Sequence, residues 1–256
     1  MFARVSHGQA VARTEHKWPH FNSHWLGRGV LLLVVGLLLG WLFQQLADPR
    51  TLPIHKIRVQ GALVHVNEAM LRNSVVGKVQ GGYFNIDVAS LRKTVEQLPW
   101  VKTAAVRRLW PDTVVINVVE QQPLAIWAKG GLVNLEGDVF VPAMNDEFKD
   151  LPVFSAPDGM QHSVTELYRD LSAQLKPLDL HIVSLQLDER RAVQLQLHNG
   201  IELMLGREER LVRLQRFVKV YNKALLHHAM RIRRVDLRYS NGMAVQWDNS
   251  KTQVKS

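Results

Sequence analysis

The sequence of 256 residues contains no cysteine, so structural disulfides and thiolate metal sites are excluded. Short motifs of common enzyme classes are also missing. There is no G-x-S-x-G, no GxGxxG, no HExxH and no GxxxxGK followed by Ser or Thr. We therefore expect a protein that is not an enzyme and that needs no cofactor.

Histidine is plentiful, with eleven residues, and this raises the question of a metal site. His16, His20 and His24 are spaced by four, but Pro19 interrupts any helix that would align them. The adjacent pair at 227–228 would diverge by about 100° on a helix and so could not chelate one ion together. We predict no metal site.

Acidic residues are outnumbered, with 23 Asp plus Glu against 32 Lys plus Arg, for a net charge of +9. Such an excess suits nucleic acid, anionic lipid or an acidic protein partner, and does not choose between them. The densest basic stripe lies on a predicted helix over 207–226, opposite its apolar stripe and without interleaved aromatic residues. We interpret it as a solvated face and predict no nucleic-acid binding. Its members are Arg210, Arg213, Arg216, Lys219 and Lys223.

One long apolar run is present. Residues 29–47, GVLLLVVGLLLGWLFQQLA, carry no charge, and 19 residues of helix span about 28 Å, close to the hydrocarbon thickness of a bilayer. A buried core helix would show a polar stripe, which 30–43 lacks, and a cleaved signal peptide would show small residues at its end. We predict an uncleaved transmembrane helix.

The orientation of this helix follows from the charges beside it. The 28 residues before it carry four basic residues and one acid, Glu15. A basic excess favours the inside of the membrane. We expect a cytoplasmic tail over 1–28 and a carboxyl-terminal part on the far side, in a periplasm-like space.

The soluble part is predicted to be α+β, in two units. Over 54–122 the order is β-α-α-β-β: a strand at 54–60, helices capped by Asn67 and Asp87, and strands at 101–109 and 113–120. Over 123–249 the pattern is β-rich, with amphipathic helices at 164–175 and 207–226. A final hairpin is expected with Val235, Leu237 and Tyr239 on one strand and Ser240-Asn241-Gly242 as its turn. The last residues, 250–256, are polar and are predicted to be disordered.

Four motifs in this region resemble the FtsQ/DivIB family of bacterial cell-division proteins. They are Leu98-Pro99-Trp100-Val101, Ala105-Val106-Arg107-Arg108, Trp110-Pro111-Asp112-Thr113 and Glu120-Gln121-Gln122-Pro123. The resemblance covers nearly the whole chain, and its β-α-α-β-β unit corresponds to the family's POTRA (polypeptide-transport-associated) domain. Trp100 and Trp110 are interpreted as packing residues.

The resemblance implies a role and a place in the cell. Members of the Gram-negative form are single-pass (type II) proteins of the inner membrane, with a periplasmic carboxyl-terminal domain, concentrated at the division septum. They act as scaffolds of the divisome that bind the small coiled-coil proteins FtsB and FtsL, and through them affect septal peptidoglycan synthesis.

The binding site is predicted at the last strand, 243–247, which no later segment of the sequence can cover. Unpaired N–H and C=O groups along an open edge accept a further strand, and aromatic and basic side chains beside it supply anchors. In the resemblance the same sheet edge binds FtsB. The predicted contact residues are Arg190, Arg238, Tyr239, Asn241, Gly242, Val245 and Trp247.

Alternatives stay open at this stage. Tyr239 and Trp247 on an alternating strand would also suit a packed core. Where better-known family members have a lysine shortly before the hairpin, this chain has Met230-Arg231, so Arg231 or Arg233 would have to supply that contact. A POTRA-type chaperone or transport-associated protein would need tandem POTRA repeats or a β-barrel, and a wall hydrolase would need a carboxylate or metal cluster. The sequence shows neither.

Overall fold

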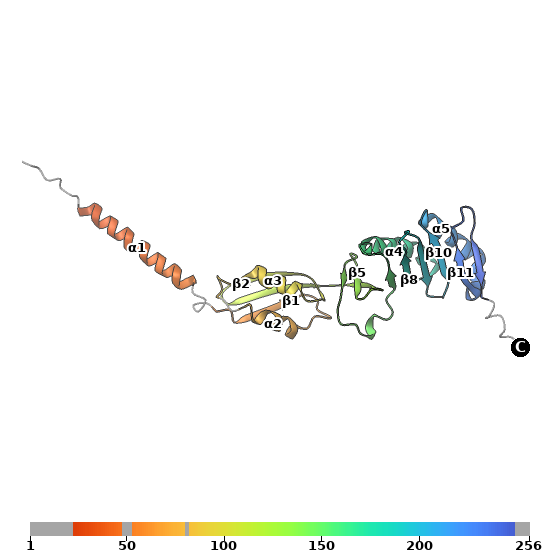
Figure 1. The fold of residues 1–256 in the computed structure, drawn as a ribbon. Coiled ribbons are helices and arrows are strands. Elements are labelled where there is room, and N and C mark those ends of the chain that lie inside the picture. Colours follow the sequence, from red (N-terminus) through yellow and green to blue (C-terminus); the bar gives the residue numbers. More distant parts are fainter. Residues whose placement is uncertain (1–22, 48–52, 80–81, 249–256) are drawn as a thin grey trace, which may run out of the picture.

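The structure is a computed structural model that describes residues 23–47, 53–79 and 82–248 (Figure 1). The predicted disordered tail, 250–256, and most of the predicted cytoplasmic tail, 1–28, lie outside the described residues. The first helix, α1 (Ser23–Ala47), includes the apolar run, and its described leucine and valine side chains are exposed. Among the helices of the described residues, none combines the length and the apolar character needed to span a bilayer.

The first folded unit has the predicted β-α-α-β-β order. Its sheet has the strand order β1-β3-β2, so β3 is central, β1 lies parallel to it and β2 antiparallel. Both β1 and β2 are edge strands. The elements are β1 (Lys56–Gln60), α2 (Glu68–Val76), α3 (Val88–Glu96), β2 (Val101–Leu109) and β3 (Thr113–Glu120).

Local sequence explains where the two helices of this unit begin. The side chain of Asn67 accepts a hydrogen bond from Ala69 N at 2.8 Å, and Asp87 Oδ1 accepts from Ala89 N and Ser90 N, both at 3.0 Å. These bonds satisfy backbone donors that a helix start leaves free. Both predicted caps are confirmed. The helices pack their apolar stripes on one face of the sheet through Leu71, Val75, Leu91 and Val95, all fully buried against Val114 and Ile116.

The second unit is a nine-stranded mixed sheet with the order β12-β11-β10-β9-β8-β7-β4-β5-β6. Helices α4 and α5 cover one face, and their residues Leu171 and Phe217 share a core with Leu185 and Leu203 of the sheet. The opposite face carries a polar groove of about 410 Å³ lined by glutamines, Glu202 and Arg233. The strands are β4 (Pro123–Trp127), β5 (Leu132–Asn134), β6 (Val139–Phe140), β7 (Val153–Ser155), β8 (Ile182–Leu187), β9 (Val193–Leu197), β10 (Glu202–Gly206), β11 (Ile232–Asp236) and β12 (Ala244–Trp247).

Helical segments of this unit lie between the strands. They are η1 (Asp146–Phe148), α4 (Gln161–Leu175), η2 (Lys176–Leu178), α5 (Arg210–Val220), η3 (Tyr221–Leu225) and η4 (Leu226–Arg231). The prediction of one α-helix over 207–226 is therefore wrong at both ends. Glu209 adopts a left-handed φ of 50° before α5, and the chain after Val220 widens into a short π-helix and then tightens into a 3-10 helix. The short parallel strand β7 was not predicted, because three residues between prolines carry no clear periodicity.

The predicted final hairpin is also partly wrong. β11 begins at Ile232 and ends at Asp236, so Leu237 and Tyr239 do not belong to it. Leu237 is fully buried, whereas 58% of Tyr239 is exposed, and the alternation expected along 235–239 breaks between them. Seven residues, 237–243, join β11 to β12 in place of a tight turn.

The two units meet at a packed junction. Trp100, just before β2, lies with ring centroids 5.3 Å from Phe140 and 5.5 Å from Phe148, both in the second unit. His65 stacks flat on Trp100, with centroids 3.8 Å apart and planes 6° apart. Trp100 is a packing residue as predicted.

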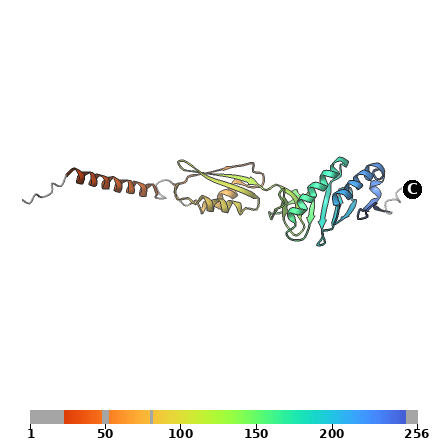
Figure 2. The ribbon, with the colours of Figure 1, turned by 90° about the horizontal axis from the view of Figure 1, so that it is seen from above.

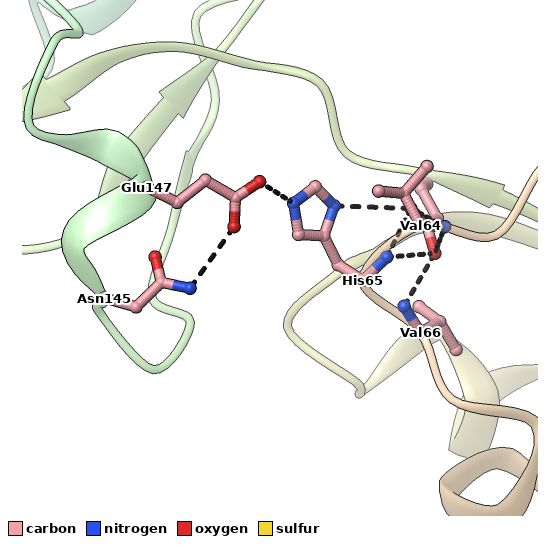
Figure 3. Close-up of polar contacts among 6 residues, drawn as sticks. Val64, His65, Val66, Asn145 and Glu147 are labelled. Carbon is pink, nitrogen blue, oxygen red and sulfur yellow. Dashed lines mark hydrogen bonds and ion pairs between the residues drawn. The ribbon is translucent and has the colours of Figure 1, made fainter.

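Polar contacts complete this junction (Figure 3). His65 Nε2 lies 3.2 Å from Glu147 Oε1 of η1, and His65 Nδ1 lies 3.5 Å from Glu120 Oε2. Glu120 also accepts hydrogen bonds from the backbone N–H groups of Val64, His65 and Val66 at 2.7–3.2 Å. Through His65, these contacts connect the end of β3 in the first unit with η1 in the second. The two units lie one after the other along the molecule (Figure 2).

Candidate partner-binding edge

The strand β12 forms one edge of the nine-stranded sheet, at the end of the molecule far from the first unit (Figure 1). It pairs antiparallel with β11, with Val245 opposite Val235 and Ala244 opposite Asp236. No other strand of the described residues pairs with its outer side. The prediction that the last strand lies at a sheet edge is confirmed for this part of the chain.

The direction of the backbone groups of β12 can be worked out residue by residue. Asp248 N donates to Arg231 O at 2.6 Å, so the N–H group of Asp248 points toward the side of β11. In a β-strand the peptide groups of alternate residues point to the same side. Those of Gln246 and Ala244 therefore also face β11, and the N–H and C=O groups of Val245 and Trp247 face outward. These are the groups that an added strand would bond.

The side chains of β12 divide between the two faces of the sheet. The side chain of Val245 is half-buried and packs on the core beneath α5. Only the backbone of Val245 is therefore available on the open side of the strand. Ala244 and Gln246 are exposed on the opposite face. Trp247 is 41% exposed and meets His228 edge-to-face, with ring centroids 6.1 Å apart. Burial in the core, the alternative considered for Trp247 and Tyr239, is wrong for both.

The connection 237–243 carries four more predicted residues, three of which line a groove. Tyr239, Asn241 and Gly242, with the three other residues over 239–244, line an open groove of about 390 Å³ beside the start of β12. The ring of Tyr239 is largely exposed there, so an incoming apolar side chain would find an uncovered aromatic surface.

Arg216 holds this connection in shape. It reaches from α5, and its Nη1 donates to Tyr239 O at 2.8 Å and to Gly242 O at 2.9 Å. One guanidinium thus satisfies both ends of a segment that has lost the regular pairing of a strand. Sequence reasoning interpreted Arg216 as part of a solvated stripe. The sequence shows only a basic residue two positions after Leu214. It does not show that the carbonyl groups of Tyr239 and Gly242 lie within reach of this side chain.

Arg238 forms a two-pronged pair with Asp236. Its Nε lies 2.9 Å from Asp236 Oδ1 and its Nη2 lies 2.7 Å from Oδ2. The hydrogen bond from Arg238 lowers the pKa of Asp236, against the opposing effect of burial, and the same pairing raises the pKa of Arg238. The stem of Arg238 also crosses Gly206, where a Cβ atom would lie 3.1 Å from Arg238 Cγ and where the φ of 73° is strained for any residue other than glycine. Arg238 is therefore already occupied, and a partner carboxylate would have to share it.

Arg190 lies at the same end of the sheet, in the turn between β8 and β9. Two strands, β10 and β11, separate β9 from β12, and at about 4.8 Å per strand this puts Arg190 roughly 14 Å from the edge. Arg190 is exposed and makes no ion pair with any described residue. Arg231 and Arg233 are exposed too and lie opposite the carboxyl end of β12. The edge is thus flanked by basic side chains.

In the described part of the chain, no three His, Asp or Glu side chains come close enough to hold a metal ion. A groove of about 530 Å³ lies at the junction beside Glu120 and is mostly apolar.

Comparison with known proteins gives a consistent result for both units. Residues 52–121 match the model of the POTRA domain, FtsQ-type, and residues 125–238 match that of the cell division protein FtsQ/DivIB, C-terminal. The cell division protein FtsQ of Coxiella burnetii is 36% identical over 219 residues, 86% of this chain and 89% of that protein. That of Vibrio cholerae is 34% identical over 259 residues, 97% of this chain and 96% of its own. That of Shewanella oneidensis is 36% identical over 231 residues, 89% and 88% of the two chains.

Proposed function

Because this chain belongs to the FtsQ/DivIB family of cell-division proteins, we propose that it is a non-catalytic scaffold of the septal divisome that captures a partner strand on β12. The partner we propose is the periplasmic segment of FtsB, bound together with FtsL. The observation that carries the proposal is the free outer side of β12 in the described sheet, with Tyr239 and Trp247 exposed beside it.

Strand addition fits the physical character of this edge. A partner strand would bond the outward N–H and C=O groups of Val245 and Trp247, and these bonds depend little on its sequence. Selectivity would come from side chains in the groove at Tyr239 and against Trp247, since exposed aromatic rings make strong contacts when covered. Basic side chains lie toward both ends of β12, with Arg190 on the side of its start and Arg231 and Arg233 beside its carboxyl end, and they favour a partner segment with acidic residues.

We also propose that residues 29–47 anchor the chain in the inner membrane, with residues 1–28 in the cytoplasm and the two folded units in the periplasm. The support is the uncharged 19-residue run in the sequence and the basic residues before it. In this arrangement β12 lies at the end of the molecule far from the POTRA domain, where segments of other periplasmic proteins can reach it.

A binding experiment tests the partner site. The full chain, in detergent or in membrane discs, is titrated with a peptide of the periplasmic part of FtsB, and Tyr239→Ala and Trp247→Ala are compared with the unchanged chain. Loss of an exposed aromatic anchor is expected to weaken binding by at least about tenfold in each variant.

The matched control is Trp110→Ala, which removes a Trp that is 71% exposed but lies on the POTRA domain. It is expected to bind like the unchanged chain. Normal binding by both edge variants would show that this site is wrong even if the family is right.

A further inference from the structure

The end of the POTRA domain where the chain enters carries a surface that partner binding at β12 does not use. Two stretches of chain meet there: residues 77–79 and 82–86, which lie between α2 and α3, and the turn at 110–112 between β2 and β3. His55 N donates to Asp112 O at 3.0 Å, and Pro53 bridges to Gly82, so both stretches lie beside the point of entry. Arg108 links them, because its Nη1 donates to Tyr83 O and Phe84 O at 3.2 and 3.0 Å. We call this the entry surface.

Large apolar side chains stand exposed on the entry surface. Trp110 is 71% exposed, Phe84 52% and Leu109 37%, and Tyr83 meets Phe84 edge-to-face at 5.3 Å. The prediction that Trp110 packs inside the fold is therefore wrong. Trp100, at the opposite end of the same strand, is covered by the second unit. Exposing such side chains to water is unfavourable by about 25 cal/mol per Å² of apolar area, so clustered exposure points to something that covers them.

Positive charge surrounds these aromatic rings. Lys56, Lys78, Arg107 and Arg108 are exposed at this end, against two carboxylates. Asp112 faces Lys56 and His55 at 4.0 and 3.8 Å, and Asp87 is engaged in capping α3. The net character is basic. Aromatic rings flanked by basic side chains are the combination that settles at the boundary between lipid headgroups and acyl chains.

Covalent geometry keeps this surface close to the proposed anchor. Only residues 48–52 lie between the end of α1 at Ala47 and Pro53. Six Cα-to-Cα steps reach at most about 22 Å, even when fully extended. A surface tethered so closely has a high effective concentration at the bilayer, so contacts that are individually weak suffice to hold it there.

We propose that the entry surface docks on the outer leaflet of the membrane that holds the anchor. Trp110 and Phe84 enter the headgroup layer, and Arg107 and Lys56 pair with lipid phosphates. This inference rests on the membrane anchor proposed above. Docking fixes the tilt of the POTRA domain, and since the second unit is packed on its opposite end (Figure 2), it also holds β12 away from the bilayer.

Site-directed spin labelling tests the contact, because a chain without cysteine takes a label at one introduced position only. The full chain carrying Phe84→Cys with a nitroxide is reconstituted in vesicles of phosphatidylethanolamine and phosphatidylglycerol. The control label is at Val64→Cys, a 79% exposed position at the other end of the POTRA domain, beside Glu120. The label at 84 is expected to be reached by oxygen from the bilayer and protected from a water-soluble nickel chelate, and the label at 64 is expected to show the reverse.

Two further variants in the Phe84→Cys background measure the forces involved. Trp110→Ala is expected to return the label to water. Arg107→Ser is expected to lower the docked-to-free ratio by about fivefold, the effect of one basic residue at an anionic surface. Both side chains are exposed, so neither change is expected to unfold the domain.

The outcomes separate this inference from the anchor on which it rests. If alkaline washing extracts the chain from the vesicles, the anchor is wrong and the docking with it. If the chain resists extraction but the label at 84 is as accessible to the nickel chelate as the label at 64, the anchor stands and the docking alone is wrong.

Discussion

Glu120 shows how one side chain organises the region between the two folded units. Its carboxylate is nearly covered and accepts backbone N–H groups from three consecutive residues, 64–66. Burial by itself raises the pKa of Glu120, but the hydrogen bonds from Val66, Val64 and His65, with the charge of His65, outweigh it and lower the pKa below the ordinary 4.5. The charged form is therefore the one that the fold stabilises.

This shift predicts a pH dependence of stability. A carboxyl group with a depressed pKa contributes its full stabilisation above its unfolded value, here 4.5, and loses it as the pH falls through the folded pKa. Glu120→Gln keeps the shape but not the charge, so we expect a loss of about 1–2 kcal/mol at pH 7. Urea unfolding at pH 7 and below pH 4.5 measures this difference, which should shrink in acid.

Glu147→Gln is the comparison for Glu120. This change also removes a carboxylate that contacts His65, but the side chain of Glu147 is 53% exposed. Exposed ion pairs contribute little to the free energy of unfolding, so we expect a small loss. Equal losses in the two variants, or a loss at Glu120 that persists unchanged in acid, would contradict the role given to the backbone hydrogen bonds.

At the scale of the element, β12 is a strand whose two sides differ. The pairing with β11 fixes one side, and the packing of Val245 on the core fixes which face points inward. What remains available to a partner is a short row of peptide groups. Binding at such an edge should therefore respond to changes in the backbone as well as in side chains.

Val245→Pro tests this directly. Proline removes the N–H group that faces outward, and edge strands tolerate proline where the lost N–H points off the sheet. We expect the domain to stay folded and affinity for the FtsB peptide to fall by about tenfold or more, the cost of one lost hydrogen bond and a blocked approach. Isothermal titration calorimetry with the full chain measures the change.

Val245→Ala controls for the loss of the valine side chain. It weakens packing but keeps the N–H, so affinity should stay close to that of the unchanged chain. Equal affinity in the proline and alanine variants would exclude strand addition along β12, whatever Tyr239 and Trp247 contribute.

At the scale of the whole molecule, the POTRA domain and the second unit are joined through Trp100. Its ring touches His65 on one side and Phe140 and Phe148 on the other, so the same residue that follows the POTRA helices also covers a small core of the next unit. The relative orientation of the entry surface and of β12 depends on this contact.

Trp100→Ala should uncouple the two units. The loss of a large packed ring at the junction costs about 3 kcal/mol, and we expect one cooperative unfolding transition to separate into two. Small-angle scattering should show a broader range of shapes. Trp110→Ala, which removes an equally large but exposed ring, should leave both observations unchanged, and a single sharp transition in Trp100→Ala would show that the junction does not depend on this ring.

Much of this protein was determined by the sequence alone. Asn67 and Asp87 each cap a helix by accepting hydrogen bonds from N–H groups two or three residues ahead. The alternation along 113–120 likewise predicts a strand. Both signals act over short distances along the chain, so the sequence alone contains them. The family follows from motifs at fixed spacing, and the edge position of the last strand was predicted from the order of the elements.

The tertiary structure decided what depends on residues far apart in the chain. In the structure β11 ends at Asp236, because the Arg238 side chain bonds back to Asp236 and Leu237 N donates to Met204 O of β10. Tyr239 therefore lies outside the strand and is exposed. The tertiary structure also put Arg216 against the carbonyls of Tyr239 and Gly242, covered Trp100 and left Trp110 in the open. Trp100 and Trp110 cannot be told apart by their sequence context. Their environments differ because the second unit packs against Trp100 and not against Trp110.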